Sequence, residues 1–390
     1  MHTAVPVPSA PAGATRVRSF GILSTFPPTS CGIATFSAAL AVGLIGDGAS
    51  VEVVRVGPPP EVEDVLVVGS LGDRSDAGHL RAIDALNRND LVIVQHEYGL
   101  YEGPDGESLI DMMASIDAPV VVVAHTVLDE PTPNQRRVLE QVCDGADAIV
   151  VMTETARERL VNGFDVDHSM VHLIPHGAAT PLAAPGASAR DHGTPQRVLT
   201  WGLLGPGKGV EWAIEALAEL RDLDPLPEYV VAGATHPKVR ERHGEAYREM
   251  LLERAETSPV EVTFDGAYRD LMSLTELIQS ADLVVLPYDS RDQVTSGVLV
   301  DAVAAGRPVV STAFPHAVEL LASGAGLVVP QRDPVALGRA IRRVLTEPGL
   351  AASMEAEARR LAPDLAWSAV ARRYAELADL VVAARRPVSS

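Results

Sequence analysis

The sequence predicts an α/β protein built from two doubly wound domains. Its 390 residues exceed what one hydrophobic core usually serves, so two domains of ordinary size are expected. Ala and Val are abundant while aromatic residues make up 4% of the chain, a composition that suits helices packed on parallel sheets. Short apolar runs alternate with helical or polar stretches along both halves, and this alternation is the signature of repeated βαβ units.

Composition and charge exclude several functional classes. The net charge is −20 and Lys and Arg form no long block, so neither a nucleic-acid surface nor strong docking to anionic lipid is expected. Cys31 and Cys143 form no CxxC pair, which argues against a disulfide framework or a zinc site and favours a reducing compartment. No apolar run approaches the roughly 18 residues of a membrane span, and no signal peptide is recognised. We therefore expect a cytoplasmic protein.

Residues 16–180 carry the apolar runs of a first sheet. Residues 1–15 precede them as a tail expected to be disordered. Residues 181–196 follow as a linker, because they are rich in Ala, Pro, Gly and Ser without periodicity. The predicted strands are Val17–Ser24, Val51–Val56, Val65–Val68, Leu91–Gln95, Val120–Ala124, Ala148–Met152 and Val171–Pro175.

The loop after the first strand is a possible phosphate or sugar site. Two prolines stop the strand, and Gly32 permits a close backbone approach at the start of a helix that runs to about Leu44. An ordinary βα turn explains the same residues and, on the sequence alone, is the more frequent outcome. Cys31 lies in this loop without a neighbouring base, so a small packed side chain is expected there.

Polar residues follow two neighbouring strands of this half. His96 and Glu97 end one strand, and His125 ends the next. The carboxyl ends of parallel strands line the crevice of a doubly wound sheet, so these three side chains are expected to share one cleft. His176 ends a further strand and is interpreted as part of the turn that closes the domain.

The second domain, residues 197–365, opens with the strand Arg197–Trp201, a glycine-rich loop and the helix Val210–Leu220. Lys208 at the helix start completes a phosphate cradle. A nucleotide-hydrolysing P-loop is a poor interpretation, because Gly209 stands where a Mg²⁺-binding Ser or Thr is needed. The further predicted strands are Tyr229–Gly233, Val260–Phe264, Leu283–Leu286, Pro308–Thr312 and Leu327–Pro330.

The stretch from Ala281 to Thr312 is where we expect the chemistry. A polar loop with Arg291 and Gln293 leads to Ser296-Gly297, where a helix to Ala305 begins. Free amide groups and the positive end of the helix dipole predict an anion site there. Asp301 lies one turn inside among apolar neighbours, within reach of ribose hydroxyls. Any βαβ unit has a polar loop at this place, and that alternative carries similar weight.

Four motifs resemble the family-4 retaining glycosyltransferases. The run D-A-V-A-A-G-R-P-V-V from Asp301 is similar to the E-A-M-A-A-G-x-P-V-V run of that family. The loop P-P-T-S-C-G-I-A-T-F, the H-E-Y-G segment from His96 and the I-P-H-G turn also match. The resemblance covers nearly the whole chain. It implies the GT-B fold, with two doubly wound Rossmann-like domains facing a central cleft and a last helix, residues 366–390, that crosses back to the first domain.

The resemblance also implies an activity. A retaining, metal-independent enzyme of this family moves a hexose from a nucleotide diphosphate sugar to a hydroxyl of a sugar or glycoside, with no permanently bound cofactor. GDP-mannose is the first expectation for the donor by family frequency, and UDP-glucose is the second. The residues assigned by the resemblance or by their place in the loops are His125 and Gln293 at the catalytic centre; Gly32, Lys208, Arg291, Ser296 and Gly297 on the donor phosphates; Asp301 on the donor ribose; Gly233, Phe264 and Tyr268 around the nucleobase; and His96 and Glu97 on the acceptor side.

Two departures from the family pattern keep other functions open. Gln293 stands where the family usually has a Glu, and Leu203 stands where it has an Arg that neutralises the diphosphate. Arg291 is the residue that we expect to replace this Arg. Another GT-B enzyme, such as a nucleotide-sugar epimerase or a phosphorylase, and a non-catalytic sugar-nucleotide-binding protein are the alternatives.

Overall fold

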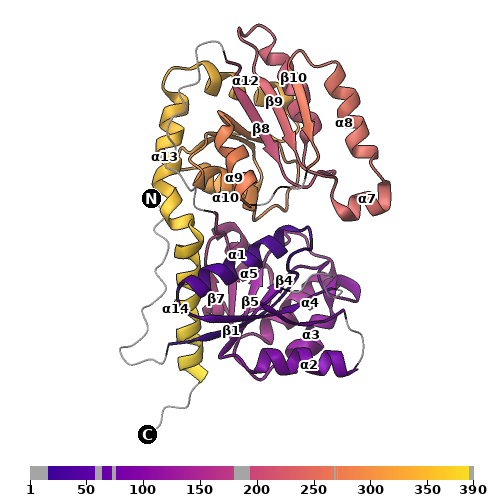
Figure 1. Ribbon diagram of the computed structural model, residues 1–390, viewed down its shortest axis with the longest axis vertical. Coiled ribbons are helices and arrows are strands. Elements are labelled where there is room, and N and C mark those ends of the chain that lie inside the picture. The colour runs from indigo at the N-terminus through magenta and orange to yellow at the C-terminus, as the bar shows by residue number, and fades with distance from the viewer. Residues whose placement is uncertain are drawn as a thin grey trace. The chain divides into compact units, whose positions relative to one another are not determined.

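The computed structural model describes residues 16–57, 64–72, 76–179, 194–267, 269 and 271–385 (Figure 1). The chain divides into two compact units. Unit 1 is residues 1–177 with 367–390, and unit 2 is residues 178–366. The predicted tail and most of the predicted linker lie outside the described residues.

Unit 1 is built on a parallel sheet in the order β3-β2-β1-β4-β5-β6-β7. Phe20 of β1 pairs with Val51 of β2 on one side and with Leu91 of β4 on the other. The central strands are almost entirely buried, which explains why they appear as continuous apolar runs in the sequence. The strands are β1 (Ser19–Ser24), β2 (Ser50–Arg55), β3 (Val67–Ser70), β4 (Leu91–His96), β5 (Val120–Ala124), β6 (Ala148–Val151) and β7 (Val171–Leu173).

The helices of unit 1 start at recognisable caps. The Thr132 hydroxyl accepts a hydrogen bond from the Gln135 amide, and the Gln135 side chain accepts one from the Thr132 amide. Helix α4 therefore begins with a capping box. Thr153 caps α5 through the amide of Ala156. The helices are α1 (Gly32–Gly46), α2 (Asp76–Asn87), α3 (Ser108–Met113), α4 (Pro133–Asp144), α5 (Glu154–Gly163) and α14 (Trp367–Arg385).

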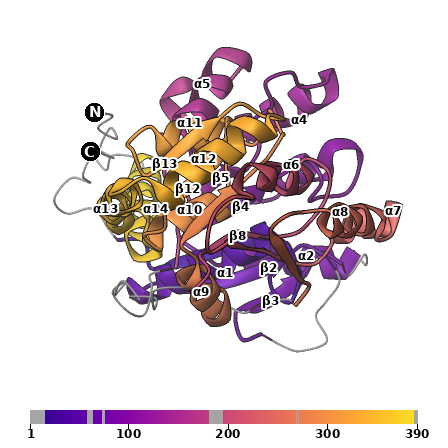
Figure 2. The ribbon, with the colours of Figure 1, turned by 90° about the horizontal axis from the view of Figure 1, so that it is seen from above.

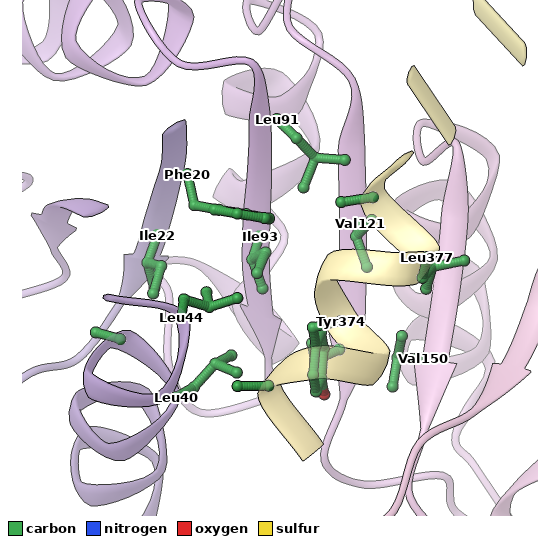
Figure 3. Close-up of a cluster of buried hydrophobic side chains, with 14 of the residues drawn as sticks. Phe20, Ile22, Leu40, Leu44, Leu91, Ile93, Val121, Val150, Tyr374 and Leu377 are labelled. Carbon is green, nitrogen blue, oxygen red and sulfur yellow. The ribbon is translucent and has the colours of Figure 1, made fainter. Parts of the chain in front are cut away.

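The last helix, α14, completes the core of unit 1. Leu40 and Leu44 of α1 and Tyr374 and Leu377 of α14 share a buried cluster with side chains of β1, β4, β5 and β6 (Figure 3). Each large apolar side chain buried in this way contributes about 1.5–3 kcal/mol relative to exposure. The segment 367–385 is therefore part of this core although it is far away in sequence.

Unit 2 has a second parallel sheet, in the order β10-β9-β8-β11-β12-β13. Helices cover both faces, and Figure 2 shows α8 and α9 on opposite sides of β8. Its strands are β8 (Arg197–Trp201), β9 (Glu228–Ala232), β10 (Glu261–Asp265), β11 (Leu283–Leu286), β12 (Val309–Thr312) and β13 (Gly326–Val329). Its helices are α6 (Val210–Ala216), α7 (Pro237–His243), α8 (Ala246–Glu256), α9 (Leu271–Ser280), α10 (Gly297–Ala304), α11 (Pro315–Leu321), α12 (Pro334–Thr346) and α13 (Leu350–Leu365).

The predicted α/β class is confirmed, and every predicted strand is present with its ends shifted by two residues at most. The predicted helix Val210–Leu220 is divided, because α6 ends at Ala216 and a 3₁₀ turn covers Leu217–Leu220. Helices α7 and α8, between β9 and β10, were not predicted from the sequence. Within the described residues, no helix combines the length and apolar character that crossing a membrane requires.

Gly43 provides a test of the α1–α14 packing. A Cβ at Gly43 would lie 2.7 Å from the Ala371 Cβ and 3.1 Å from the Trp367 carbonyl oxygen. Gly43→Ala should therefore lower the free energy of unfolding by about 1–3 kcal/mol, because overpacking outweighs the gain in helix propensity. Urea unfolding followed by circular dichroism measures this change.

Gly46 of the same helix is the matched control. A Cβ there meets no atom within 4 Å, so Gly46→Ala should be neutral or slightly stabilising. Equal effects of the two substitutions would contradict a tight contact at Gly43.

Candidate functional site

In each unit the strand order reverses at one place, between β1 and β4 in unit 1 and between β8 and β11 in unit 2. Ligands of doubly wound sheets bind in the crevice at the carboxyl end of the strands at such a switch point. The loops that follow these four strands contain Gly32, Glu97, Lys208 and Gln293. The topology of each unit therefore places its predicted residues at the expected edge of its own sheet.

In unit 1, the loop after β1 is held in place by hydrogen bonds, whereas Gly32 at its end is exposed. The Cys31 sulfur caps α1 by accepting the amide of Ala34 at 3.3 Å. Gly32 is exposed, and a Cβ there would meet no atom within 4 Å. The start of α1 thus presents its first residue to open space, where a ligand can approach the backbone.

Arg55 at the end of β2 holds this loop and was missed in the sequence. Its side chain is 5% exposed; Nε donates to the Phe26 carbonyl at 3.2 Å and Nη2 donates to the Thr29 hydroxyl at 2.7 Å. Both acceptors belong to the segment between β1 and α1. A buried guanidinium is costly unless it is hydrogen-bonded, so these contacts tie the loop to the sheet. An Arg at the end of an apolar strand was the signal available in the sequence.

His125, at the end of β5, is held in one tautomer. Its Nε2 donates to Gln95 Oε1 at 2.6 Å, which leaves Nδ1 as an acceptor. The ring lies edge-to-face against Phe36, with the centroids 4.9 Å apart. Burial, and next the neighbouring His176 and His96, lower the pKa of His125 to about 3. The ring is neutral at ordinary pH and can accept a hydrogen bond from a hydroxyl.

His176 packs on the same Phe36 ring. The two centroids are 5.1 Å apart, and His176 Nδ1 lies 2.6 Å from the Gly177 carbonyl oxygen. Trp367 contacts Phe36 as well, with its ring centroid at 5.0 Å. A Cβ at Gly177 would lie 2.4 Å from the Trp367 ring, so only glycine fits at this position. Burial lowers the pKa of His176 to about 4.

His96 and Glu97 occupy different environments although they are adjacent. His96 is 1% exposed and lies edge-to-face to Tyr98, with centroids 5.2 Å apart. Burial lowers its pKa to about 4. Glu97 is half-buried and accepts the Thr126 hydroxyl at 2.5 Å and the Tyr98 amide at 3.0 Å. The structure therefore places Glu97 where a ligand can contact it, whereas His96 shapes the region from within the core.

In unit 2, Lys208 is positioned by an aromatic face. Its Nζ lies 4.2 Å from the centroid of the Tyr288 ring, a cation–π contact. Tyr288 is 2% exposed and stacks on Phe314, with centroids 5.0 Å apart and an interplanar angle of 25°. The ring therefore holds the ammonium group without neutralising it. Tyr288 was not among the predicted site residues.

The loops that carry Lys208 and Tyr288 are locked together by their backbones. The Asp289 amide donates to the Gly207 carbonyl at 3.1 Å. Gly209 has φ +65°, and a Cβ there would lie 1.9 Å from the Pro287 carbonyl oxygen. Gly209 is thus required by this close approach, which agrees with the absence of a hydroxyl residue at that position.

The start of α10 is capped more fully than the sequence suggested. The Ser296 hydroxyl accepts the Leu299 amide at 3.3 Å, and the Ser296 amide donates to His316 Nδ1 at 2.8 Å. The Gln293 side chain donates to the Thr295 carbonyl, within its own loop. The Ser296 amide is therefore not free, and an anion at this helix start would meet the amides of Gly297 and Val298. His316, 5% exposed on α11, is a further site residue that was not predicted from the sequence.

Asp301 lies on α10 among buried apolar neighbours. It is half-buried, and its carboxylate accepts the backbone amide of Ala179. Burial raises the pKa of Asp301 to about 7, and the bond to Ala179 opposes part of that rise. A carboxyl group that titrates near neutrality is rare on a surface helix and frequent at a site.

The loops predicted for the nucleobase meet at Arg248 on α8, which was also missed. Gly233 follows β9 with φ +146°, and a Cβ there would lie 1.9 Å from the Gly202 carbonyl oxygen. The Arg248 guanidinium lies over the Phe264 ring and bonds to the Gly233 carbonyl. Tyr268 lies outside the described residues, and Arg291 is exposed on its loop. No cluster of three or more His, Cys, Asp or Glu that could hold a metal is found in the described part of the chain.

Two family models match the chain. The model described as Glycosyltransferase Family 4 matches residues 31–180, and the model described as Glycosyl transferases group 1 matches residues 195–347. Together they cover most of unit 1 and unit 2. The resemblance to the family-4 glycosyltransferases is thereby confirmed.

Individual relatives agree with these matches. The D-inositol 3-phosphate glycosyltransferase of Corynebacterium efficiens is 28% identical over 280 residues, which is 66% of this chain and 65% of the relative, slightly less than two thirds of its length. Sucrose-phosphate synthase from Thermosynechococcus elongatus has a TM-score of 0.72 at 18% identity and covers 94% of this chain and all of that one. Anabaena Alr3699/HepE in complex with UDP-glucose has a TM-score of 0.68 at 15% identity, over 92% of this chain and 98% of that one. The predicted GT-B fold is confirmed by these structures.

The buried histidines of unit 1 predict a pH dependence of stability. An unfolded His titrates near 6.5, whereas folded His96 stays neutral down to about 4. Its folded pKa is depressed, so its contribution is complete above pH 6.5 and is lost as the pH falls from there toward 4. Between pH 7 and 5, His96 alone should lower the free energy of unfolding by about 1–2 kcal/mol.

His96→Phe isolates this effect. Phe keeps the ring contact with Tyr98 and removes both ring nitrogens, so the loss between pH 7 and 5 should shrink by that amount. Urea unfolding at the two pH values on both proteins measures it. Equal losses would show that His96 does not carry the pH dependence.

Proposed function

Since this chain belongs to the family-4 glycosyltransferases, we propose that it is a retaining enzyme that transfers a hexose from a nucleotide diphosphate sugar to a hydroxyl of an acceptor. The observation that carries the proposal is the Lys208 ammonium, fixed over the Tyr288 ring at the switch point of unit 2. A positive charge held by a ring rather than by a carboxylate keeps its full attraction for a phosphate.

The chemistry requires charge stabilisation as the bond from sugar to phosphate breaks. Negative charge develops on the departing diphosphate, and Lys208 with the amides at the start of α10 is arranged to receive it. These groups supply positive charge from the protein itself, which supports a mechanism without a protein-bound metal. Gly32 at the start of α1 adds a backbone amide, and Arg291 adds a second cation.

Other residues bind the donor or the acceptor. Asp301 accepts the ribose hydroxyls, and Gly233 and Phe264 lie beside the base. His125 Nδ1 accepts a hydroxyl of the donor sugar, since Gln95 occupies the other ring nitrogen. Gln293 lies beside the reacting sugar in place of the family's carboxylate, and Glu97 contacts the acceptor.

Donor and acceptor are proposed from the relatives. UDP-glucose is the first donor to test, because one structural neighbour, Anabaena Alr3699/HepE, is a complex with that ligand. GDP-mannose, first by family frequency, becomes second, since the relatives described above give mannose no support. The acceptor named for the curated relative is D-inositol 3-phosphate, and a phosphorylated cyclitol is the first acceptor to test here. The free thiols of Cys31 and Cys143 support a cytoplasmic location.

The test of this function is a transfer assay with the full chain. UDP-glucose or GDP-mannose is incubated with and without D-inositol 3-phosphate, and NMR follows the sugar and its anomeric configuration. Release of the diphosphate with an α-linked product from the α-linked donor supports retaining transfer. Assays with and without a chelator test the metal independence.

Four results would contradict the proposal. A product with inverted anomeric configuration would exclude the retaining mechanism. Conversion of the donor to an epimer, or phosphorolysis of a glycoside, would favour another GT-B enzyme. Binding without transfer or donor hydrolysis, across the donors and acceptors tested, favours a non-catalytic binding protein.

Lys208→Ala should weaken binding of the nucleoside diphosphate by about 1.5–3 kcal/mol, the scale of a charged hydrogen bond. Binding of the nucleoside, which lacks phosphates, should stay unchanged. Calorimetric titration of both ligands gives the difference. Unchanged diphosphate affinity would remove Lys208 from the phosphate site.

The Tyr288 ring offers matched controls for the same experiment. Tyr288→Phe keeps the aromatic face and should keep the diphosphate affinity. Tyr288→Leu removes the aromatic face. It should weaken binding of the nucleoside diphosphate by about 0.5–2 kcal/mol and leave binding of the nucleoside unchanged.

Asp301→Asn should leave the protein folded, because the amide oxygen can still accept the Ala179 amide. It should weaken ribonucleotide binding by about 1.5–3 kcal/mol and nearly abolish the preference over the 2′-deoxy analogue. Calorimetry and thermal unfolding on one preparation measure both quantities. Lowered stability with unchanged affinity would show that Asp301 is structural only.

The raised pKa of Asp301 adds a second readout of the same variant. The ionised carboxylate is the better acceptor, so affinity for the sugar nucleotide should rise as the pH rises through about 7. The diphosphate of a sugar nucleotide does not titrate in this range, and Asp301→Asn should show no such rise.

A further inference from the structure

Arg248 on α8 connects two segments, the turn after β9 and the end of β10 with the turn that follows it. Its Nη1 donates to the Gly233 carbonyl, after β9, at 2.9 Å. Its Cζ lies 5.7 Å from the centroid of the Phe264 ring, on β10. Its Nη2 would lie 3.2 Å from a Cβ at Gly266, so the absence of a side chain there gives the guanidinium its room. These are the turns at the carboxyl ends of β9 and β10, where the base was predicted.

Asp265 on β10 feels the charge of Arg248, but its hydrogen bonds go to other groups. Asp265 accepts the Ala267 amide at 2.9 Å through Oδ1 and pairs with Arg269 through Oδ2. A guanidinium has five N–H donors and no acceptor. Among the described residues, one of those donors is used on Gly233. The half-buried Arg248 thus holds further donors beside the turn at Gly266.

We propose that Arg248 selects the nucleobase of the donor by donating a hydrogen bond to an exocyclic carbonyl oxygen, as uracil and guanine possess. This inference rests on the proposed function of unit 2 as the nucleotide-binding half. Adenine carries an amino group where guanine carries that oxygen, so two donors would face each other. At a site with a buried or half-buried donor, a ligand without a matching acceptor leaves that donor unpaired. Such a ligand is rejected more strongly than one that differs only in shape.

The geometry favours hydrogen-bond selection over simple stacking. Arg248 Cζ lies over the Phe264 ring and Nη1 is hydrogen-bonded to the Gly233 carbonyl, so the guanidinium is positioned before a ligand arrives. A preorganised guanidinium loses little entropy on binding. A matched hydrogen bond of this kind changes the relative affinity for two bases by about tenfold or more.

The test measures dissociation constants of UDP, GDP and ADP for the full chain by calorimetry. The wild type should bind UDP or GDP at least about tenfold more tightly than ADP. Arg248→Met keeps the length of the side chain and removes the donors. It should bring the favoured diphosphate to within about twofold of ADP while leaving ADP affinity nearly unchanged. Arg254→Met, on an exposed position of the same helix, is the control and should change none of the three.

Several outcomes would overturn the inference. Equal weakening of all three diphosphates by Arg248→Met would show that Arg248 only supports the Gly233 turn. A wild type that binds all three equally overturns base selection while the proposed function stands, and this result needs no variant to fold. A wild type that binds none of them overturns the proposed nucleotide site together with the inference.

Discussion

The contact between the Lys208 ammonium and the Tyr288 ring is the interaction on which the candidate phosphate site of unit 2 depends. A carboxylate in the place of the ring would hold Lys208 equally well, but it would cancel the charge that a diphosphate needs. The ring can act only if it is immobile, and stacking on Phe314 provides this. The contact also requires the two loops to touch, which the left-handed Gly209 against Pro287 permits. Glycine spacing, aromatic stacking and charge are therefore parts of one constraint.

The sequence predicted the two sheets because strands buried on both faces must be apolar along their length, and short runs of Val, Ile and Leu between polar segments are typical of such strands. It also predicted Lys208 and Asp301 as site residues, because residues close to them in the sequence indicate their roles. Lys208 is a lysine after glycines at a helix start, and Asp301 is a single acid in an apolar helix. The family models support the resemblance that completed this interpretation. The assigned roles of these residues remain predictions, since a fold match does not locate a ligand.

Residues whose roles arise from tertiary contacts were not visible in the sequence. Tyr288 looks like the end of an ordinary strand, and its importance appears only when Lys208 lies over it. Arg248 is one charge among many on a polar helix until Gly233 and Phe264 are placed beside it. His316 takes the amide of Ser296, so the capping of α10 could not be judged from the Ser-Gly pair alone. Each contact joins segments that no periodicity or motif relates.

The two units use ionisable groups in opposite ways. In unit 1 burial keeps His96, His125 and His176 neutral, with pKa values well below the physiological range, so their protonation does not change near pH 7. Such rings serve as fixed hydrogen-bonding and packing groups. In unit 2 burial raises the pKa of Asp301 to about 7, so the same physical cause puts that group at the midpoint of its titration. Desolvation always favours the neutral form; whether it makes a residue insensitive or responsive to pH depends on which side of neutrality its ordinary pKa lies.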